Sequence, residues 1–303
     1  MILFPNCKIN LGLHIINRRL DGYHNLETLF YPVPLCDALE VIALKNEVLD
    51  STQNGLENNT QNSSEISRQS EPILGAKIIM EGIPVAGNPE NNLVFKAYAL
   101  LKEDYSLGAV EFCLLKNIPM GAGLGGGSSD GAFAIKLLNK LFKLEISIEK
   151  QEKYAAKLGS DCSFFIQNTP CIGTGRGEIL EPISLSLKGL WMVLVKPNIH
   201  IGTAEAFAQI KPRNTWDLQQ NFSLKDLPNI PIENWKNILV NDFEASIFPN
   251  HLILSQIKES LYQKGAIYAA MSGSGSTIFG LFKVQANLKN TFPNLFYFES
   301  KLD

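Results

Sequence analysis

Strands and helices alternate along this chain without a regular strand–helix–strand repeat, which predicts an α+β fold. The length of 303 residues predicts about two domains. The alternation restarts after about residue 170, so we expect an N-terminal domain over 1–170 and a C-terminal domain over 171–303. With 45% hydrophobic residues, the chain can bury a sizeable core.

The N-terminal half contains both kinds of element. Residues 8–16 alternate polar and apolar side chains, which is the period of a half-buried strand. The Asp21-Gly22 dipeptide predicts a turn over 18–24. We expect further strands at 38–44, 76–81 and 109–115, and helices at 90–102, 129–142 and 148–158. The polar composition between 45 and 72 predicts a long, partly disordered insertion between two strands.

The C-terminal half has a similar mixture of elements. Strands are expected at 191–196, 266–272 and 276–283, and helices at 203–210 and 252–264. A proline-rich loop separates the two helices. The chain shows no internal sequence repeat.

Composition and charge exclude several classes of protein. A net charge of −3 argues against a nucleic-acid partner, which normally requires a basic excess. The apolar stretches are far shorter than the ~20 residues that a membrane span needs, and the N-terminus does not resemble a signal peptide. The five cysteines show no Cys-x-x-Cys spacing, which predicts neither a disulfide framework nor a zinc site and favours a reducing cytoplasm.

A glycine-rich segment between a predicted strand and a predicted helix carries the clearest functional signal. Five glycines within seven residues are costly unless the backbone must approach a ligand closely. The first turn of a helix offers free N–H groups and a positive dipole end, which bind phosphates. The predicted ATP-phosphate segment comprises Pro119, Met120, Gly121, Ala122, Gly123, Leu124, Gly125, Gly126, Gly127, Ser128 and Ser129. The two serines add hydroxyl donors and can help to hold a magnesium–phosphate unit.

Three other interpretations of this segment are weaker. A purely structural turn does not require five glycines. A dinucleotide-binding fingerprint fits Gly121, Gly123 and Gly126, but the preceding chain lacks the βαβ context. A P-loop requires lysine after the last glycine, where Ser128 stands. Phosphate binding in a different architecture is therefore favoured.

Three segments together resemble the signatures of the GHMP kinases. These are Lys8-Ile9-Asn10, the 119–130 segment and Gly159-Ser160-Asp161, and a Gly/Ser turn at 271–276 resembles a further motif. From Cys7 to about Phe282, the chain resembles the 4-diphosphocytidyl-2-C-methyl-D-erythritol kinase family within this superfamily. The resemblance implies an N-terminal ATP-binding domain, a C-terminal ferredoxin-like α/β sandwich domain, and an active site in the cleft between them.

The resemblance also implies a reaction. ATP, with Mg²⁺ shielding its charge, would phosphorylate the 2-hydroxyl of a small molecule that carries a cytidine diphosphate group, in the non-mevalonate isoprenoid pathway. Asp161 would take the proton from this hydroxyl, and Lys8 would orient Asp161 and balance charge. The family usually has an apolar residue and a proline after the aspartate, but Cys162 and Ser163 stand here. Taken alone, Lys8 and Asn10 would be the solvent-facing side of an edge strand.

The segment Asp21-Gly22-Tyr23-His24 distinguishes this family from the mevalonate and homoserine kinases. The resemblance implies that His24 reads the cytosine edge and that Tyr23 lies beside it; a neutral imidazole offers the required donor and acceptor. Phe207 matches the second aromatic residue of a cytosine clamp and Thr203 a residue near the methylerythritol. Asn10 is the fifth implied substrate-binding residue. Tyr23-His24 as a plain turn pair and Phe207 as a core residue remain the alternatives.

Asn92 and Lys116 match family positions near the adenine, although Lys116 could also be an ordinary surface lysine. The glycines of 271–276 are expected to line the cleft or to pack against the phosphate loop. Arg176, in another turn that resembles the family, is expected to be exposed and receives no role. The sequence does not identify the metal ligands, and it leaves open whether the chain is a monomer or a homodimer.

Two other functions remain open at this stage. One is a sister kinase with a different alcohol substrate, which would not depend on cytidine. The other is a nucleotide-binding protein without catalysis, which should have lost at least one of Lys8, Asn10 and Asp161.

Overall fold

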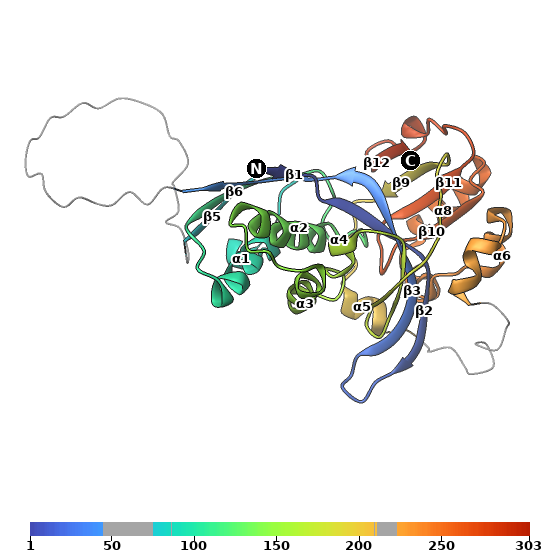
Figure 1. Ribbon diagram of the computed structural model, residues 1–303. Coiled ribbons are helices and arrows are strands. Elements are labelled where there is room, and N and C mark those ends of the chain that lie inside the picture. The colour runs from blue at the N-terminus through green and yellow to red at the C-terminus, as the bar shows by residue number, and fades with distance from the viewer. Residues whose placement is uncertain (45–74, 86, 209, 211–222) are drawn as a thin grey trace, which may run out of the picture.

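The computed structural model describes residues 1–44, 75–85, 87–208, 210 and 223–303 (Figure 1). The predicted insertion at 45–72 and residues 211–222 of the predicted proline-rich loop lie outside these residues. The described remainder of that loop contains short helical segments between Leu224 and Ile247, which the sequence did not predict. Within the described ranges, the strands form three four-stranded sheets. No helix in this part of the chain is both long enough and apolar enough to cross a membrane.

The first sheet has helices on one face. Its strands are β1 (Ile2–Leu3), β4 (Ala38–Ala43), β6 (Val110–Lys116) and β5 (Ala76–Gly82), in that order. The helices are α1 (Leu93–Asp104), α2 (Gly126–Leu141), α3 (Ile148–Leu158) and α4 (Phe164–Gln167). Alternate residues such as Val41 and Phe112 are fully buried in the core beneath these helices.

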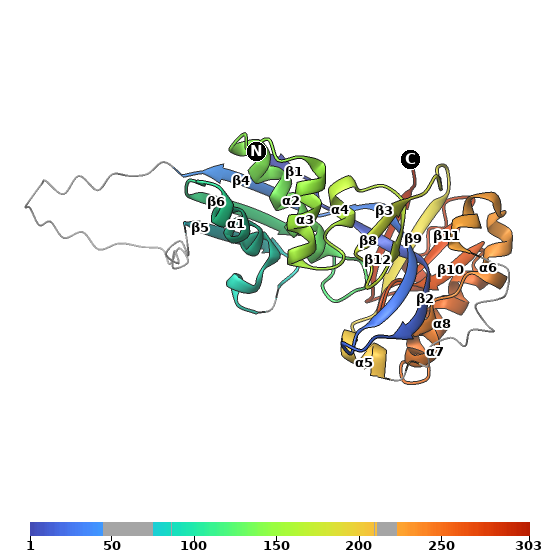
Figure 2. The ribbon, with the colours of Figure 1, turned by 60° about the horizontal axis from the view of Figure 1, so that its bottom comes forward.

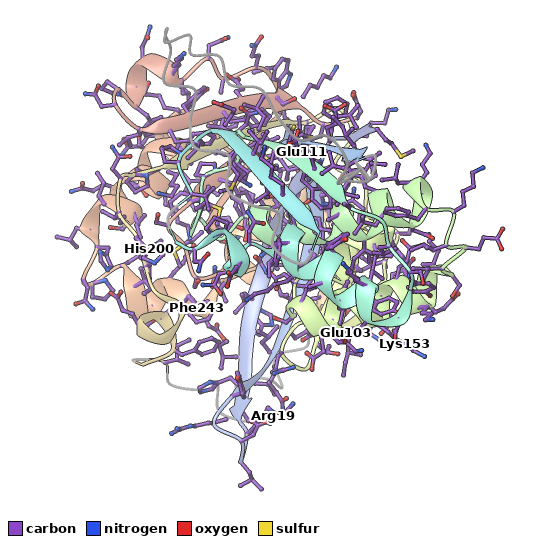
Figure 3. The ribbon with its side chains drawn as sticks, turned by 90° about the vertical axis from the view of Figure 1, so that its left-hand side faces the viewer. Arg19, Glu103, Glu111, Lys153, His200 and Phe243 are labelled. Carbon is purple, nitrogen blue, oxygen red and sulfur yellow. The ribbon has the colours of Figure 1, made fainter. Side chains whose placement is uncertain are left out.

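The second sheet contains a long hairpin that projects from the molecule. Its strands, in order, are β2 (Asn6–Arg18), β3 (His24–Cys36), β7 (Cys171–Thr174) and β8 (Ile179–Pro182). Figure 3 shows Arg19 near the tip of this hairpin, at the predicted turn. A domain boundary at 170 would separate β7 from β3, its hydrogen-bonded neighbour. We propose that the boundary lies after β8, between 182 and 191.

The third sheet forms the other end of the molecule (Figure 2). Its strands are β10 (Tyr268–Met271), β11 (Ile278–Phe282), β9 (Trp191–Lys196) and β12 (Phe296–Lys301), in that order and all antiparallel. Numbered along the chain, this order is 2-3-1-4, which is the order of a ferredoxin-like sheet. The implied architecture of the C-terminal half is confirmed.

Two apolar cores lie on the two faces of this third sheet. One face packs against the second sheet through residues such as Ile9, Leu29 and Phe279. The other face packs against helices through residues such as Val193 and Leu254. The helices of this half are α5 (Thr203–Ala208), α6 (Trp235–Ile238), α7 (Asp242–Ile247) and α8 (Leu252–Gln263). Short 3₁₀ turns lie at Pro89–Asn91, Leu224–Asn229, Ile232–Asn234 and Lys289–Thr291.

Most of the predicted elements are present with ends that move by one to three residues, and the α+β class is confirmed. The sequence missed β3, which extends for 13 residues. Pro32 and Pro34 interrupt its pattern, because proline normally argues against a strand interior. The short strands β7 and β8 and the C-terminal β12 were also missed.

Candidate active site

A cavity of about 1260 Å³ lies between the helices of the first sheet, the β2–β3 hairpin and the loops that follow β9 and β10. Most of the predicted site residues line it: Lys8, Asn10, Tyr23, His24, Asn92, Lys116, Pro119, Met120, Gly121, Ala122, Gly123, Gly125, Gly126, Gly127, Ser128, Asp161 and Phe207. Leu124 and Ser129 are fully buried and do not line it. Thr203 begins α5, but its side chain lies outside the described part of the structure.

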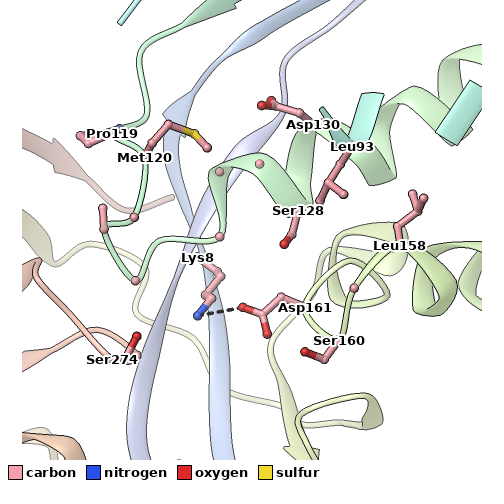
Figure 4. A pocket seen from close by; sticks show the side chains of 18 of the residues that line it. Lys8, Leu93, Pro119, Met120, Ser128, Asp130, Leu158, Ser160, Asp161 and Ser274 are labelled. Carbon is pink, nitrogen blue, oxygen red and sulfur yellow. Dashed lines mark ion pairs between the residues drawn. The ribbon is translucent and has the colours of Figure 1, made fainter. Parts of the chain in front are cut away.

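The glycine-rich segment forms a turn that leads into α2. Gly121, Gly123 and Gly125 have φ values of 58°, 73° and 70°, which L side chains rarely adopt. Helix α2 begins at Gly126, so its first N–H groups have no partner within the helix and are available to a ligand in the cavity (Figure 4). A Cβ atom at Gly127 would meet only Met120 Cε, at 3.7 Å, so this side of the turn is open. These features fit an anionic phosphate.

The Gly/Ser turn after β10 packs directly against this segment. A side chain at Gly123 would overlap the carbonyl oxygen of Ser272. The Ser272 hydroxyl donates to the Gly123 carbonyl at 2.8 Å, and the N–H of Thr277 donates to the Ala122 carbonyl at 3.2 Å. Residues 273–275 also line the cavity. Both expectations for this turn, lining and close packing, are confirmed.

Lys8, Asn10 and Asp161 meet beside the glycine-rich turn. The Lys8 ammonium donates to Asn10 Oδ1 at 2.6 Å and lies 3.4 Å from Asp161 Oδ2 (Figure 4). Asn10 Nδ2 donates to Thr28 Oγ1 at 2.9 Å, which fixes the amide with its oxygen toward Lys8. Lys8 and Asn10 are only 4% and 2% exposed, so the solvent-facing alternative for this pair is wrong.

Asp161 differs from its partners because its side chain is 33% exposed and faces the cavity. It follows Gly159, which ends α3, and it lies in the turn before α4. The unusual residues after it are buried and do not line the cavity. Burial raises the pKa of the Cys162 thiol to about 12, so this thiol is protonated at neutral pH. Cys162 and Ser163, which depart from the family pattern, therefore do not block access to Asp161.

Lys116 lies in a second cluster of charges, with two carboxylates that the sequence did not single out. Its ammonium contacts Asp37 Oδ2 and lies 2.7 Å from Asp130 Oδ2. Lys116 is 1% exposed, so the surface-lysine alternative is wrong. Asp37 Oδ1 also accepts the N–H groups of Asn117 and Ile118, at 2.6 and 2.8 Å. Hydrogen bonding to Asp37 therefore fixes the chain just before the glycine-rich turn.

Asp130 is the carboxylate of this cluster whose charged form is disfavoured by burial. Burial raises its pKa to about 7, although the Lys116 charge opposes the shift. Its Oδ1 atom has no hydrogen-bond partner among the described residues, and the residue lines the cavity. Asn92, also on the cavity wall, caps α1 by accepting the Val94 N–H at 2.9 Å.

His24 and Phe207 come together at the far end of the cavity. Their rings stack with centroids 4.8 Å apart and an interplanar angle of 13°. Burial, followed by the nearby Arg18 charge, lowers the pKa of His24, so its imidazole is neutral at pH 7. Phe207 is half-buried and lines the cavity, so it is not simply a core residue. Tyr23 is 57% exposed and lies on the same wall.

Two further lining residues were assigned no role from the sequence. His200 lies so close to Gly121 that a side chain at Gly121 would strike its ring. No motif marked His200, because it follows β9 in an irregular loop. Arg176 is exposed, as expected, but it also lines the cavity.

Known proteins resemble the chain over its whole length. The GHMP kinases N terminal domain family matches residues 92–169, and the GHMP kinases C terminal family matches 223–294. A 4-diphosphocytidyl-2-C-methyl-D-erythritol kinase from Bacteroides fragilis is 48% identical over 303 residues, which covers 100% of both chains. A kinase of the same name from Bacteroides thetaiotaomicron is 46% identical, again over 100% of both chains.

Solved structures agree with this relationship. A crystal structure of a 4-(cytidine 5'-diphospho)-2C-methyl-D-erythritol kinase matches with a TM-score of 0.76 and 25% identity, and it covers 100% of both chains. Mevalonate kinase from Methanococcus jannaschii has a TM-score of 0.65 at 12% identity, covers 100% of this chain and 98% of its own, and shares the fold. The predicted GHMP-kinase fold is confirmed. The chain belongs to the GHMP kinases and, within them, to the 4-diphosphocytidyl-2-C-methyl-D-erythritol kinase family.

Proposed function

We propose that this chain transfers the γ-phosphoryl group of ATP to the 2-hydroxyl of 4-diphosphocytidyl-2-C-methyl-D-erythritol, giving the 2-phosphate and ADP. The observation that carries the proposal is the Lys8–Asn10–Asp161 cluster beside an open helix N-terminus in one cavity. Full-length relatives that carry this name support the choice of substrate. The reaction belongs to isoprenoid precursor synthesis, and we place the enzyme in the cytoplasm.

Phosphoryl transfer depends mostly on positioning and on electrostatic stabilisation. The N–H groups at the start of α2 and the Ser128 hydroxyl bind the nucleotide phosphates, since both face the cavity. Asn92 and Lys116 mark the adenine end of the nucleotide site. Lys116 cannot act as a free cation there, because two carboxylates already balance its charge.

Asp161 accepts the proton of the 2-hydroxyl as the oxygen attacks the γ-phosphorus and ADP leaves. Its exposed carboxylate can reach a substrate, and the buried Lys8 ammonium holds it and faces the transferred group. Asn10 keeps Lys8 in place through the 2.6 Å hydrogen bond. One carboxylate and one cation suffice for this chemistry.

Magnesium would shield the charge of the ATP phosphates. Mg²⁺ usually keeps several waters and binds through one or two carboxylates plus substrate phosphates. The cavity fits this mode, because the Ser128 hydroxyl lies on its wall at the start of α2. The described residues contain no cluster of three acidic, histidine or cysteine side chains that could hold a metal without a nucleotide.

The cytidine end of the substrate binds at Tyr23, His24 and Phe207. The neutral imidazole of His24 supplies one donor and one acceptor, which suit the edge of a pyrimidine. Stacking on Phe207 holds the imidazole at this end of the cavity. The family resemblance assigns Thr203, at the start of α5, to the methylerythritol end of the substrate.

Coupled ADP release from purified protein with Mg-ATP tests the proposal. The diphosphocytidyl compound should support turnover, whereas mevalonate, homoserine and galactose should not. Turnover with another alcohol alone would reject the cytidine site and keep the kinase. No turnover with any of them, despite measurable ATP binding, would reject catalysis.

A further inference from the structure

The turn between β7 and β8 places an arginine, Arg176, on the wall of the cavity. Its neighbours Gly175 and Gly177 have φ values of 70° and 104°, which favour glycine and make a tight turn. The Gly175 carbonyl accepts the N–H of Leu26 at 2.7 Å. This bond ties the turn to β3 and so fixes where the arginine side chain begins.

The turn reaches from the cytidine end of the cavity to the reacting end. The Arg176 guanidinium carbon lies 5.0 Å from the centre of the Tyr23 ring. On the other side, a Cβ atom at Gly177 would lie 3.9 Å from Asp161 Oδ1. The turn that carries Arg176 therefore lies beside both the ring that marks one end of the substrate site and the carboxylate that marks the other.

The cations of the cavity wall differ in how their charge is balanced. Among the described residues, the lysines and arginines that line it are Lys8, Lys116, Lys157 and Arg176. Lys8 and Lys116 have carboxylate partners that also line the cavity. Lys157 belongs to the last turn of α3, on the helical side of the cavity. Arg176 differs from all three because it belongs to the β7–β8 turn, beside Tyr23.

The Arg176 charge remains available to a ligand. Its ionic partner is Glu178, whose Oε1 lies 3.6 Å from the guanidinium Nε, beyond hydrogen-bond distance. The Glu178 carboxylate instead accepts the backbone N–H of Arg176, at 2.5 Å. Exposed ion pairs of this kind contribute little, and the side chain is 44% exposed. The terminal nitrogens can therefore donate to another anion.

We propose that Arg176 binds the diphosphate of the cytidine diphosphate substrate. The inference rests on the proposed function: a substrate whose base lies near Tyr23 and whose hydroxyl reaches Asp161 must carry its linking diphosphate past this turn. A guanidinium matches phosphate oxygens with two parallel hydrogen bonds. Stacking on Tyr23 orients the guanidinium in advance, which reduces the entropy lost on binding.

Arg176→Met tests this role, because methionine keeps much of the packing surface and removes the charge. We expect the KM for the diphosphocytidyl substrate to rise about ten- to a hundredfold, as for the loss of charge-assisted hydrogen bonds. The KM for ATP and kcat should change little, because Arg176 contacts neither the nucleotide nor the reacting group. Arg176→Lys keeps a cation without the fork and should recover part of the loss.

Competition with simple ligands separates binding of the diphosphate from support of Tyr23. In the Met variant, the inhibition constant of CDP should weaken by a similar factor, whereas that of cytidine should stay unchanged. An equal loss for both ligands would mean that Arg176 acts only through the Tyr23 ring and would overturn the proposal. A change in the KM for ATP alone would assign Arg176 to the nucleotide and also overturn it.

A matched charge control is available beside the same sheet, in the 3₁₀ turn Leu224–Asn229. Lys225 pairs with Glu181 of β8, is 56% exposed and does not line the cavity. Lys225→Met removes the same unit charge and should leave the KM values unchanged. A similar rise in KM in this variant would mean that the effect of Arg176→Met comes from the loss of net charge and not from a contact with the diphosphate.

The proposed function can fail independently of the role of Arg176. It fails if the wild-type chain does not turn over the diphosphocytidyl substrate. CDP and cytidine binding to wild type and variant, measured by calorimetry, would still decide the role of Arg176.

Discussion

The cavity contains two clusters in which a buried lysine meets carboxylates, and they differ mainly in exposure. Lys8 faces Asp161, whose side chain is 33% exposed. Lys116 faces Asp37 and Asp130, which are 0% and 4% exposed. A carboxylate that solvent and substrate can reach is suited to proton transfer, whereas sealed carboxylates serve structure and are costly to leave unpaired. The same residue types thus divide into a reactive and a structural cluster.

Removing the lysine should affect the reaction in one cluster and the stability of the fold in the other. Lys8→Met should lower kcat by about 10²–10³-fold, because a fixed charge at the transferred phosphoryl group is lost. Its effect on the free energy of unfolding should be small, since Asp161 can be hydrated. Steady-state kinetics and thermal unfolding of the same preparation measure both. An unchanged kcat would remove Lys8 from the reaction.

Lys116→Met should instead act on stability. Removing the one cation between two buried carboxylates should cost about 3–5 kcal/mol of unfolding free energy, because their charge is left uncompensated. Urea unfolding measures this loss. The comparison would be wrong if Lys116→Met were as stable as Lys8→Met.

The sequence predicted the reactive cluster better than the structural one. Lys8, Asn10 and Asp161 lie in short motifs, and alternation along a strand already places the first two on one face. Asp37 has no such signal, because its partner Lys116 is 79 positions away and meets it only through the pairing of β4 with β6. Asp130 belongs to the glycine-rich motif, but its burial follows from the direction of α2, which a motif does not give.

The secondary structure was likewise predicted best where the sequence signal is local. Elements with a clear local period, such as α3 and β9, were predicted with their observed ends. Strand β3 was not, because its prolines oppose a strand and only pairing with β2 and β7 stabilises it. The stacking of His24 on Phe207 joins residues 183 positions apart and could be expected only from the family resemblance.

His24→Ala sharpens the contrast between binding and reaction within the cavity. We expect the KM for the diphosphocytidyl substrate to rise about tenfold, because one or two hydrogen bonds to the cytosine are lost. The value of kcat should change little, since His24 does not contact the reacting hydroxyl. Initial-rate measurements at saturating ATP test this, and a loss confined to kcat would contradict the binding role.

Asp130→Asn gives the smallest expected effect, and it depends on pH. Folding raises the pKa of Asp130 from 3.8 to about 7, so the folded state binds this proton more tightly than the unfolded state. The stability that this group contributes is therefore present at low pH and lost as the pH rises through 7. Asparagine mimics the protonated form, so the variant should gain melting temperature relative to wild type between pH 5 and 8. A difference that does not change with pH would reject the raised pKa.

Single-turnover phosphorylation of the diphosphocytidyl substrate by wild type and Asp161→Asn tests the division between the clusters most directly. The variant keeps the shape of the side chain and removes the proton acceptor. We predict a rate lower by about 10²–10⁴-fold, with unchanged ATP affinity and thermal stability. A variant that phosphorylates the substrate at the wild-type rate would show that the exposed carboxylate beside Lys8 is not the base.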